Sequence, residues 1–368
     1  MCRRWHRRFH LAILALCLGA CAVVPADELQ ALTASRDRLE ALEARLRVLE
    51  SRREQVPAAV AKARAAVAFV WGAYTFVDEA GRPLRHVLDE AGQPIADAKG
   101  VPMVDLTGTG AIAMQRYSGT AFLVDKQGHL LTNRHIAEPW WDNEDAAPLL
   151  AAGLRPRFLQ LRAFFQDRAD PAPIEVLRVD PELDVALGRT IGWTPPAEPL
   201  PIHPRPDAIA EGQAVMLVGF PTGLDAVLSK LTTEEYATLE RAGMDTYGKV
   251  EHLAREQRLL PTITGGFVWE VKPHILVYDA RTSGGGSGGP LLDRQGQVIG
   301  INAAYDPEFE GGNYGVPIAV GLRLLAGGGQ VATGATREMH ILLSDDVAPT
   351  EGTTSTMNPR SAIQRNGR

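Results

Sequence analysis

The sequence predicts an all-β protein of two small barrels, preceded by an N-terminal helical segment. From residue 69 to residue 325, short apolar runs alternate with turns rich in glycine and proline, which is typical of the strands of an all-β barrel or sandwich. A stretch of about 260 residues suits two small barrels better than one. In front of it, residues 27–68 are rich in Leu, Ala, Glu and Arg and contain no glycine, which indicates a helix.

Residues 1–20 have the pattern of an export signal of the lipoprotein type. Its basic front consists of Arg3, Arg4, Arg7 and Arg8. The apolar run that follows, residues 11–20, is shorter than the about 20 residues that a membrane-spanning helix needs. Residues 18–21 (Leu-Gly-Ala-Cys) resemble a bacterial lipobox, which predicts lipidation of Cys21 and a periplasm-facing outer-membrane lipoprotein. Ordinary signal cleavage near Ala22 or Ala26 is the alternative, and it would leave the protein secreted or periplasmic.

Cysteine use and charge are compatible with export. The three cysteines all lie within residues 1–21, at Cys2, Cys17 and Cys21, so the folded part tolerates an oxidising compartment. Removing residues 1–20 takes four arginines from 38 basic residues, which leaves 34 against 44 acidic residues and a formal charge of −10. This charge argues against nucleic acid as a partner. The sequence indicates no metal or cofactor, because it has no His-Glu-x-x-His, no cysteine pair in the folded part and no phosphate loop.

Residues 21–68 are predicted to form the lipid anchor and a coiled-coil stalk. Apolar residues recur there in two sets seven apart, as in an a/d seam: Leu32, Leu39 and Leu46, with Leu42, Leu49 and Val56. Such a stalk would join copies of the chain into a homo-oligomer. The alternative is a single amphipathic helix that lies on the folded domain.

Ser287 lies in a run of glycines, residues 284–289, that no ordinary turn requires. Glycine permits positive φ angles and a close approach of backbone N–H groups to a ligand, which an oxyanion hole needs. A flexible linker is one alternative, but strand-like segments at 290–292 and 297–302 follow at once. The spacing also matches the nucleophile elbow of α/β-hydrolases. An elbow leads into a helix and has its acid and histidine downstream, where His340 is the sole histidine, so this alternative is disfavoured.

Two further residues complete a set suited to acyl transfer. His135 ends a predicted hairpin at 118–137, and Asp184 heads an apolar strand at 183–188. A serine nucleophile needs a histidine to take its proton and a carboxylate to hold the imidazole in the right tautomer. Asp180 is the nearest alternative acid, although Pro181 beside it indicates a turn.

The chain resembles the trypsin-like serine peptidases of the HtrA/Deg type over residues 110–322. Its order of His135, Asp184 and Ser287 is the order of the chymotrypsin-like double barrel. The matching motifs are Thr132-Asn133-Arg134-His135, Asp184-Val185-Ala186-Leu187, Asp279-Ala280 with residues 285–290, Gly300-Ile301-Asn302 and residues 313–318. The resemblance implies a chymotrypsin-like fold, with His135 and Asp184 in a first half at 69–205 and Ser287 in a second half at 206–325.

The resemblance also implies a serine endopeptidase that cleaves envelope or unfolded proteins. Ser287 would be the nucleophile, His135 the general base and then acid, and Asp184 the orienting carboxylate. The backbone N–H groups of Gly285 and Ser287 would bind the oxyanion. Four residues would line the substrate pocket: Arg281, Ile301, Asn302 and Ala303.

The sequence departs from the family's pattern at the serine loop and after the second barrel. Gly286 replaces the usual asparagine or aspartate, so activation by a released N-terminal amine is not expected, and the glycine-rich loop is predicted to order only with substrate or a neighbouring copy. Only 46 residues follow Leu322, too few for the PDZ domain of many HtrA proteins, so peptide-sensing regulation of that kind is not expected.

Two other segments extend beyond the barrels. Residues 224–258 read as a helical insertion, which is either a lid or docking element near the substrate or a helical pair packed on the barrel flank. Residues 326–368 are predicted to be mostly disordered. A catalytically silent envelope scaffold, or binding lipoprotein, is the alternative function, and the presence of all three triad residue types favours the enzyme.

Overall fold

The computed structural model describes residues 26–332, apart from residues 99, 196 and 306–311. The predicted signal, Cys21 and the chain after residue 332 therefore lie outside the described residues. The chain divides into two units, residues 1–55 and residues 56–368.

A single helix, α2 (Ala26–Ala66), confirms the predicted N-terminal helix. Its 41 residues correspond to about 60 Å. The side chains of residues 33–47 are exposed, including the seam residues Leu39, Leu42 and Leu46. Because a coiled coil needs a second helix, the coiled coil itself stays a prediction. No helix within the described part of the chain combines the length and the apolar character needed to cross a bilayer.

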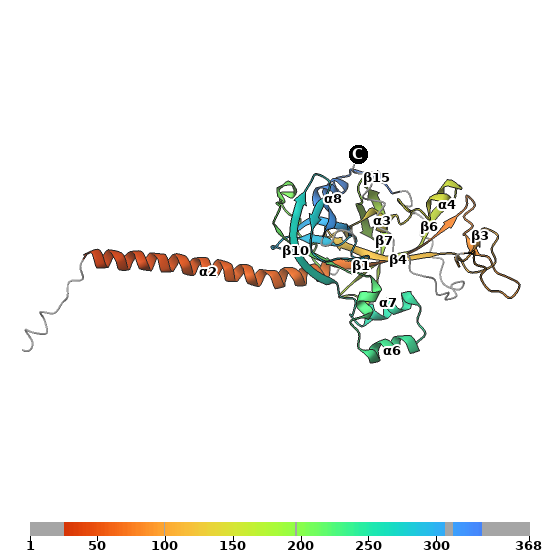
Figure 1. The fold of residues 1–368 in the computed structure, drawn as a ribbon, viewed down its shortest axis with the longest axis horizontal. Coiled ribbons are helices and arrows are strands. Elements are labelled where there is room, and N and C mark those ends of the chain that lie inside the picture. Colours follow the sequence, from red (N-terminus) through yellow and green to blue (C-terminus); the bar gives the residue numbers. More distant parts are fainter. Residues whose placement is uncertain (1–25, 99, 196, 306–311, 333–368) are drawn as a thin grey trace, which may run out of the picture. The chain divides into compact units, whose positions relative to one another are not determined.

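The first barrel is a closed antiparallel sheet whose first strand directly follows α2 (Figure 1). The last turn of α2 is buried there, at Ala63 and Ala66. Its six strands run in the order β7-β6-β1-β4-β5-β8 and close by pairing of β7 with β8. They are β1 (Val67–Val77), β4 (Gln115–Leu123), β5 (His129–Thr132), β6 (Arg155–Phe165), β7 (Ala172–Val179) and β8 (Ala186–Thr190).

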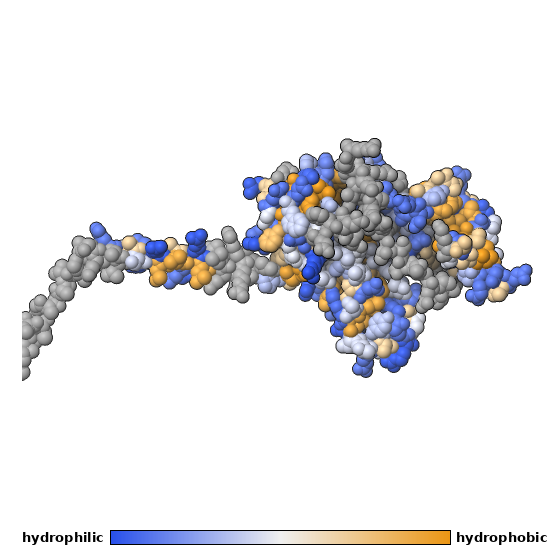
Figure 2. Space-filling model, viewed as in Figure 1, coloured by the Kyte–Doolittle hydropathy of each residue, from blue (hydrophilic) through white to orange (hydrophobic). Residues whose placement is uncertain are grey.

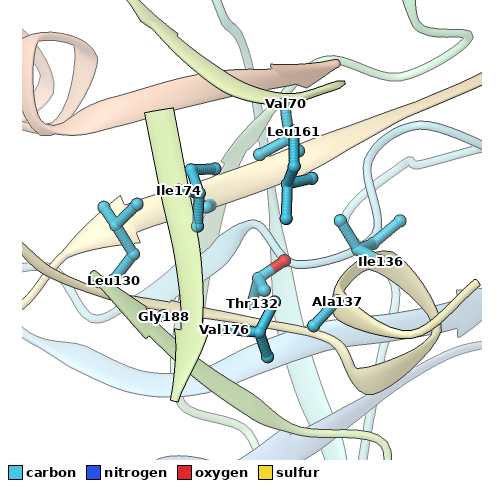
Figure 3. A pocket seen from close by; sticks show the side chains of 10 residues that line it. Val70, Leu130, Thr132, Ile136, Ala137, Leu161, Ile174, Val176 and Gly188 are labelled. Atoms are coloured by element: carbon cyan, nitrogen blue, oxygen red, sulfur yellow. The ribbon is translucent and has the colours of Figure 1, made fainter. Parts of the chain in front are cut away.

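Apolar side chains fill this barrel. Phe69, Phe122, Phe164 and Phe165 have 1% or less of their surface exposed. The cavity seen in Figure 3 between Leu130, Ile136 and Ile174 measures only about 10 Å³. This volume is barely enough for one water molecule, so the barrel is a packed core that supports its rim rather than a binding site.

The second barrel is closed in the order β10-β11-β14-β13-β12-β9. Its strands are β9 (Ala214–Gly219), β10 (Thr262–Val271), β11 (Leu276–Tyr278), β12 (Pro290–Leu292), β13 (Val298–Tyr305) and β14 (Asn313–Pro317). The helix that follows, α8 (Ile318–Leu325), packs back against the first barrel, where Gly321 lies against Leu131. The predicted architecture of two barrels after a helix is confirmed, and each barrel has six strands.

Short elements connect the strands of the first barrel and precede the second. Between β1 and β4 the chain makes turns at Gly81 and Gly92, both at positive φ, as the sequence indicates. The remaining short elements are β2 (Arg85–His86), β3 (Val104–Asp105), α3 (Arg134–Ala137), α4 (Ala147–Ala151) and the 3₁₀ turn η1 (Pro206–Ala208).

The insertion between β9 and β10 is helical, as predicted, and comprises α5 (Leu224–Leu228), α6 (Thr233–Arg241) and α7 (Thr246–Arg255). Thr232 and Glu235 form a capping box at α6, and Asp245 caps α7. Tyr247 packs against Trp71 and Phe164, with ring centroids 6.2 and 6.3 Å away. The insertion thus packs on β1 and β6 of the first barrel, although it belongs to the second.

The first residues of the segment predicted to be mostly disordered, residues 326–368, include a short strand. Residues Gln330–Val331 form β15, which pairs with Arg178 and Val179 of β7. Ala332 is buried beside them. Local composition does not reveal this pairing, because it depends on a strand about 150 residues away.

Candidate active site

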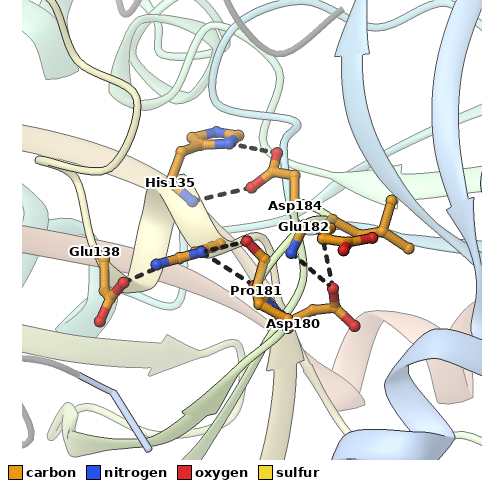
Figure 4. A network of polar contacts seen from close by, with 8 residues as sticks. His135, Glu138, Asp180, Pro181, Glu182 and Asp184 are labelled. Carbon is orange, nitrogen blue, oxygen red and sulfur yellow. Dashed lines mark hydrogen bonds and ion pairs between the residues drawn. The ribbon is translucent and has the colours of Figure 1, made fainter. Parts of the chain in front are cut away.

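His135 and Asp184 meet at one end of the first barrel. Strand β5 leads into α3, which carries His135, while Asp184 lies in the turn just before β8. Pairing of Thr132 with Ala186 brings these two ends together. The imidazole Nδ1 lies 2.7 Å from Asp184 Oδ2, and the His135 backbone N–H donates to Asp184 Oδ1 at 3.0 Å (Figure 4). The Asp184 side chain is 9% exposed and that of His135 21%.

Two buried side chains fix the short helix that carries His135. The Asn133 Nδ2 group donates to the Asp184 carbonyl at 2.7 Å. The Tyr117 hydroxyl donates to the Ile136 carbonyl at 2.8 Å. Burial raises the pKa of Tyr117 well above its usual value, so this hydroxyl keeps its proton. Both bonds fix the backbone beside His135, which keeps its side chain next to Asp184.

Arg134 links the histidine helix to the turn that contains the acid. Its Nε lies 3.0 Å from the carboxylate of Glu138, which is 1% exposed. Its Nη1 donates to the carbonyls of Asp180 and Pro181, both at 3.1 Å. The Asp180 carboxylate accepts from the N–H groups of residues 182 and 183, so Asp180 shapes the turn. Sequence reasoning missed Arg134, although its spacing from Glu138 is that of a helical ion pair.

Ser287 approaches from the second barrel, just before β12. Its carbonyl accepts a hydrogen bond from the N–H of Thr120 in β4 at 2.9 Å. Its hydroxyl donates to the Ala303 carbonyl at 3.3 Å. Within the described residues no hydrogen bond joins the hydroxyl to His135. Catalytic hydrogen bonds of this kind often tighten only when substrate binds.

Hydrogen bonds hold the glycine loop before Ser287. Three consecutive carbonyls accept bonds: that of Ser283 from Gly286 N, that of Gly284 from Thr222 N, and that of Gly285 from Thr120 Oγ1. Within the described residues, the N–H groups of Gly285 and Ser287 donate to no acceptor. Free, neighbouring N–H groups are what an oxyanion requires.

Three positions in this loop favour glycine. At two of these positions, Gly285 and Gly288, the φ angles are 86° and 85°, which residues with side chains rarely adopt, and at a third, Gly286, crowding favours glycine. A side chain at 288 would also collide with the Thr120 carbonyl, and one at 286 with the Thr282 hydroxyl. This crowding is a physical reason for a glycine, rather than a longer residue, directly before Ser287.

The four predicted pocket residues lie around the serine in different environments. Ile301 is fully buried in the core, and Asn302 is 1% exposed. The Asn302 amide accepts from the Tyr278 hydroxyl and donates to the Thr282 hydroxyl at 3.3 Å. Arg281 is exposed, and the Ala303 carbonyl is the acceptor of the Ser287 hydroxyl. The substrate pocket itself stays a prediction.

Two antiparallel barrels, with a histidine and an aspartate on the first and a serine on the second, define the class of chymotrypsin-fold serine peptidases. Residues 119–301 match the family described as trypsin-like peptidase domain. The chain therefore contains a trypsin-like peptidase domain, and its homologues are serine proteases of the HtrA/Deg type.

Two of these homologues show how much of the chain is matched. The chain is 30% identical over 204 residues to Protease Do-like 1, chloroplastic, of Arabidopsis thaliana. This match covers 55% of this chain and 37% of that protein. It is 26% identical over 222 residues to the probable periplasmic serine endoprotease DegP-like of Pseudomonas fluorescens, covering 59% and 36%. The chain thus spans little more than a third of the length of these relatives.

Solved structures of the same type are also similar. The serine endoprotease from Yersinia pestis is 18% identical, with a TM-score of 0.41 over 73% of this chain and 64% of that one.

Proposed function

We propose that the protein is a serine endopeptidase that hydrolyses peptide bonds through an acyl-enzyme on Ser287. The contact between His135 and Asp184 carries this proposal. The carboxylate holds Nδ1 at 2.7 Å, which keeps the proton of the neutral imidazole on that atom. The opposite nitrogen, Nε2, is then free to take the Ser287 proton during attack and to return it to the leaving amine.

The oxyanion of the tetrahedral intermediate would be bound by the backbone N–H groups of Gly285 and Ser287. Their lack of an acceptor within the described residues supports this role. Donors that are already in place act without reorganisation at the moment of reaction, which makes such sites effective.

We further propose that envelope or unfolded proteins are the substrates, with Arg281, Ile301, Asn302 and Ala303 around the pocket. Homologues carry names that place them in the periplasm or the chloroplast. The export signal and the lipobox-like residues before Cys21 support a periplasm-facing outer-membrane lipoprotein. Exposed apolar side chains on α2, visible in Figure 2, support a homo-oligomer through that helix.

Labelling with a fluorophosphonate tests the nucleophile. The chain from Ala22 onward is expected to be labelled, and Ser287→Ala and His135→Ala are expected to abolish labelling. Ser283→Ala, in the same loop, is the matched serine control. His129→Ala is the matched histidine control, because His129 also pairs with an aspartate, Asp125, at 2.6 Å. Labelling that survives in Ser287→Ala would contradict the proposal.

One observation favours a second function, a catalytically silent scaffold. The Ser287 hydroxyl bonds to the Ala303 carbonyl and not to His135. A scaffold would keep the barrels and bind partners through α2 or the helical insertion. Failure of the folded chain to label, even with unfolded casein added as substrate, would decide for this alternative.

A further inference from the structure

A single buried hydroxyl joins the glycine loop to the entry of the helical insertion. Thr120, in β4 of the first barrel, has none of its surface exposed. Its Oγ1 donates to the Gly285 carbonyl at 2.9 Å and accepts from the Phe220 N–H at 3.2 Å. A hydroxyl has one proton and two lone pairs, so it can make both bonds at once.

The same residue also holds the nucleophile. The Thr120 N–H donates to the Ser287 carbonyl at 2.9 Å, while its own carbonyl accepts from the Thr132 hydroxyl at 2.7 Å. Thr120 therefore contacts the second barrel on both sides of Gly286. Its backbone fixes the position of Ser287, and its side chain fixes Gly285.

These bonds determine where the proposed oxyanion donor points. In a trans peptide the C=O and the following N–H point in opposite directions. The Thr222 N–H holds the Gly284 carbonyl, so it directs the Gly285 N–H, which shares that peptide plane, to the opposite side. The next plane is held by Thr120 Oγ1 at the Gly285 carbonyl. Two successive planes are thus anchored from outside the loop.

The turn that supplies the Thr222 N–H is strained. Thr222 has a φ of 56°, an outlier for a β-branched residue. Such strain persists only when the surroundings over-determine it. The bond from Phe220 N–H to Thr120 Oγ1 is one of those constraints, since it holds the turn two residues before Thr222.

We infer that Thr120 is a positioning residue for the reaction. Its hydroxyl joins the turn at 220–223 to the glycine loop through two hydrogen bonds, and this aligns the Gly285 N–H. This inference rests on the proposed peptidase function. Loss of its hydroxyl would leave the Phe220 N–H and the Gly285 carbonyl without their partner, so the loop could turn its donor away from the oxyanion. The step affected is charge stabilisation, not substrate binding.

The test compares variants of the full chain in fluorophosphonate inactivation, with the maximal rate and the probe affinity measured separately at 25 °C. Thr120→Val keeps the shape and removes the hydroxyl, and Thr120→Ser restores it. The matched control is Thr75→Val, because Thr75 is a buried threonine of the same barrel that donates to the Ala113 carbonyl at 2.6 Å and does not contact the loop. Thermal unfolding is followed for each variant.

We expect Thr120→Val to lower the maximal rate by at least about tenfold, towards the 10²–10³-fold that loss of one oxyanion donor costs. Probe affinity should stay the same, Thr120→Ser should recover the rate, and Thr75→Val should react like the wild type.

A folded Thr120→Val that reacts at the wild-type rate would overturn the inference and leave the peptidase function standing. A wild type that is not labelled would overturn both. If Thr120→Val does not fold, Thr120→Ala, which also removes the hydroxyl, replaces it, and an unchanged rate has the same meaning.

Discussion

Asp184 contacts His135 through both of its carboxylate oxygens. One lies 2.7 Å from the imidazole Nδ1, and the other accepts the His135 backbone N–H at 3.0 Å. The acid therefore holds the ring and the start of helix α3 together, which restricts rotation of the imidazole.

Asp184→Asn should lower turnover by about ten-thousand-fold with the fold retained. The amide oxygen can still accept the backbone N–H, but its NH₂ group then faces Nδ1 and favours the wrong tautomer. Turnover of labelled casein, together with thermal unfolding, checks this. Wild-type turnover in a folded Asp184→Asn protein would contradict the assigned role of Asp184.

Arg134→Met should reduce both stability and turnover. Glu138 is buried, so loss of its ion pair with Arg134 is expected to cost about 3–5 kcal/mol of unfolding free energy. The bonds to the Asp180 and Pro181 carbonyls, which hold the turn before Asp184, are lost as well.

The double variant Arg134→Met/Glu138→Leu separates these two effects. It removes the buried carboxylate together with its ion-pair partner Arg134 and should recover part of the stability, as measured by denaturant unfolding. Turnover should stay low, because the turn is still unsupported. Recovery of both properties together would mean that Arg134 acts only on stability.

Gly288→Ala should prevent correct folding of the serine loop, whereas Gly284→Ala should be tolerated. A side chain at 288 would collide with the Thr120 backbone carbonyl at a φ of 85°. The position of a side chain at 284 is open, with no atom nearby. Strain of this kind costs on the order of 1–3 kcal/mol, and the clash adds to it. Equal melting temperatures for the two variants would contradict this prediction, because the loop would then have room for a side chain at 288.

Tyr247→Ala should destabilise the protein by on the order of 2 kcal/mol, less than the about 3–5 kcal/mol of a fully buried aromatic residue. The tyrosine joins the insertion to Trp71 and Phe164 of the first barrel. Tyr236→Ala is the matched control, since Tyr236 lies in the same insertion and is 44% exposed. Denaturant unfolding gives both values, and equal small effects would mean that the insertion is not anchored by Tyr247.

Substitution of Leu39, Leu42 and Leu46 by glutamate should convert an oligomer into a monomer. These side chains are 55–59% exposed, and their spacing is that of a coiled-coil seam. Ala44→Glu, on another face of the same helix, should leave the oligomer intact. Sedimentation of the chain from Ala22 onward measures the mass, and a monomeric wild type would contradict the coiled coil.

Local pattern was enough to predict the barrels, the helix α2 and the residues of the candidate triad. Each depends on neighbours in sequence: alternating strands, a glycine-free helical composition, a histidine after Thr132 and Asn133, and a serine among glycines. Their chemistry limits which residue types can perform acyl transfer, so the candidates could be named without coordinates.

The contacts that align these residues were decided by the tertiary structure alone. Thr120 meets Gly285 across 165 positions of sequence, and Gln330 pairs with Val179, about 150 positions before it. Tyr247 likewise finds its partners on the other barrel. A hydrogen bond depends on distance and direction between atoms, and for segments this far apart both are set by how the whole chain closes, not by the residues beside them.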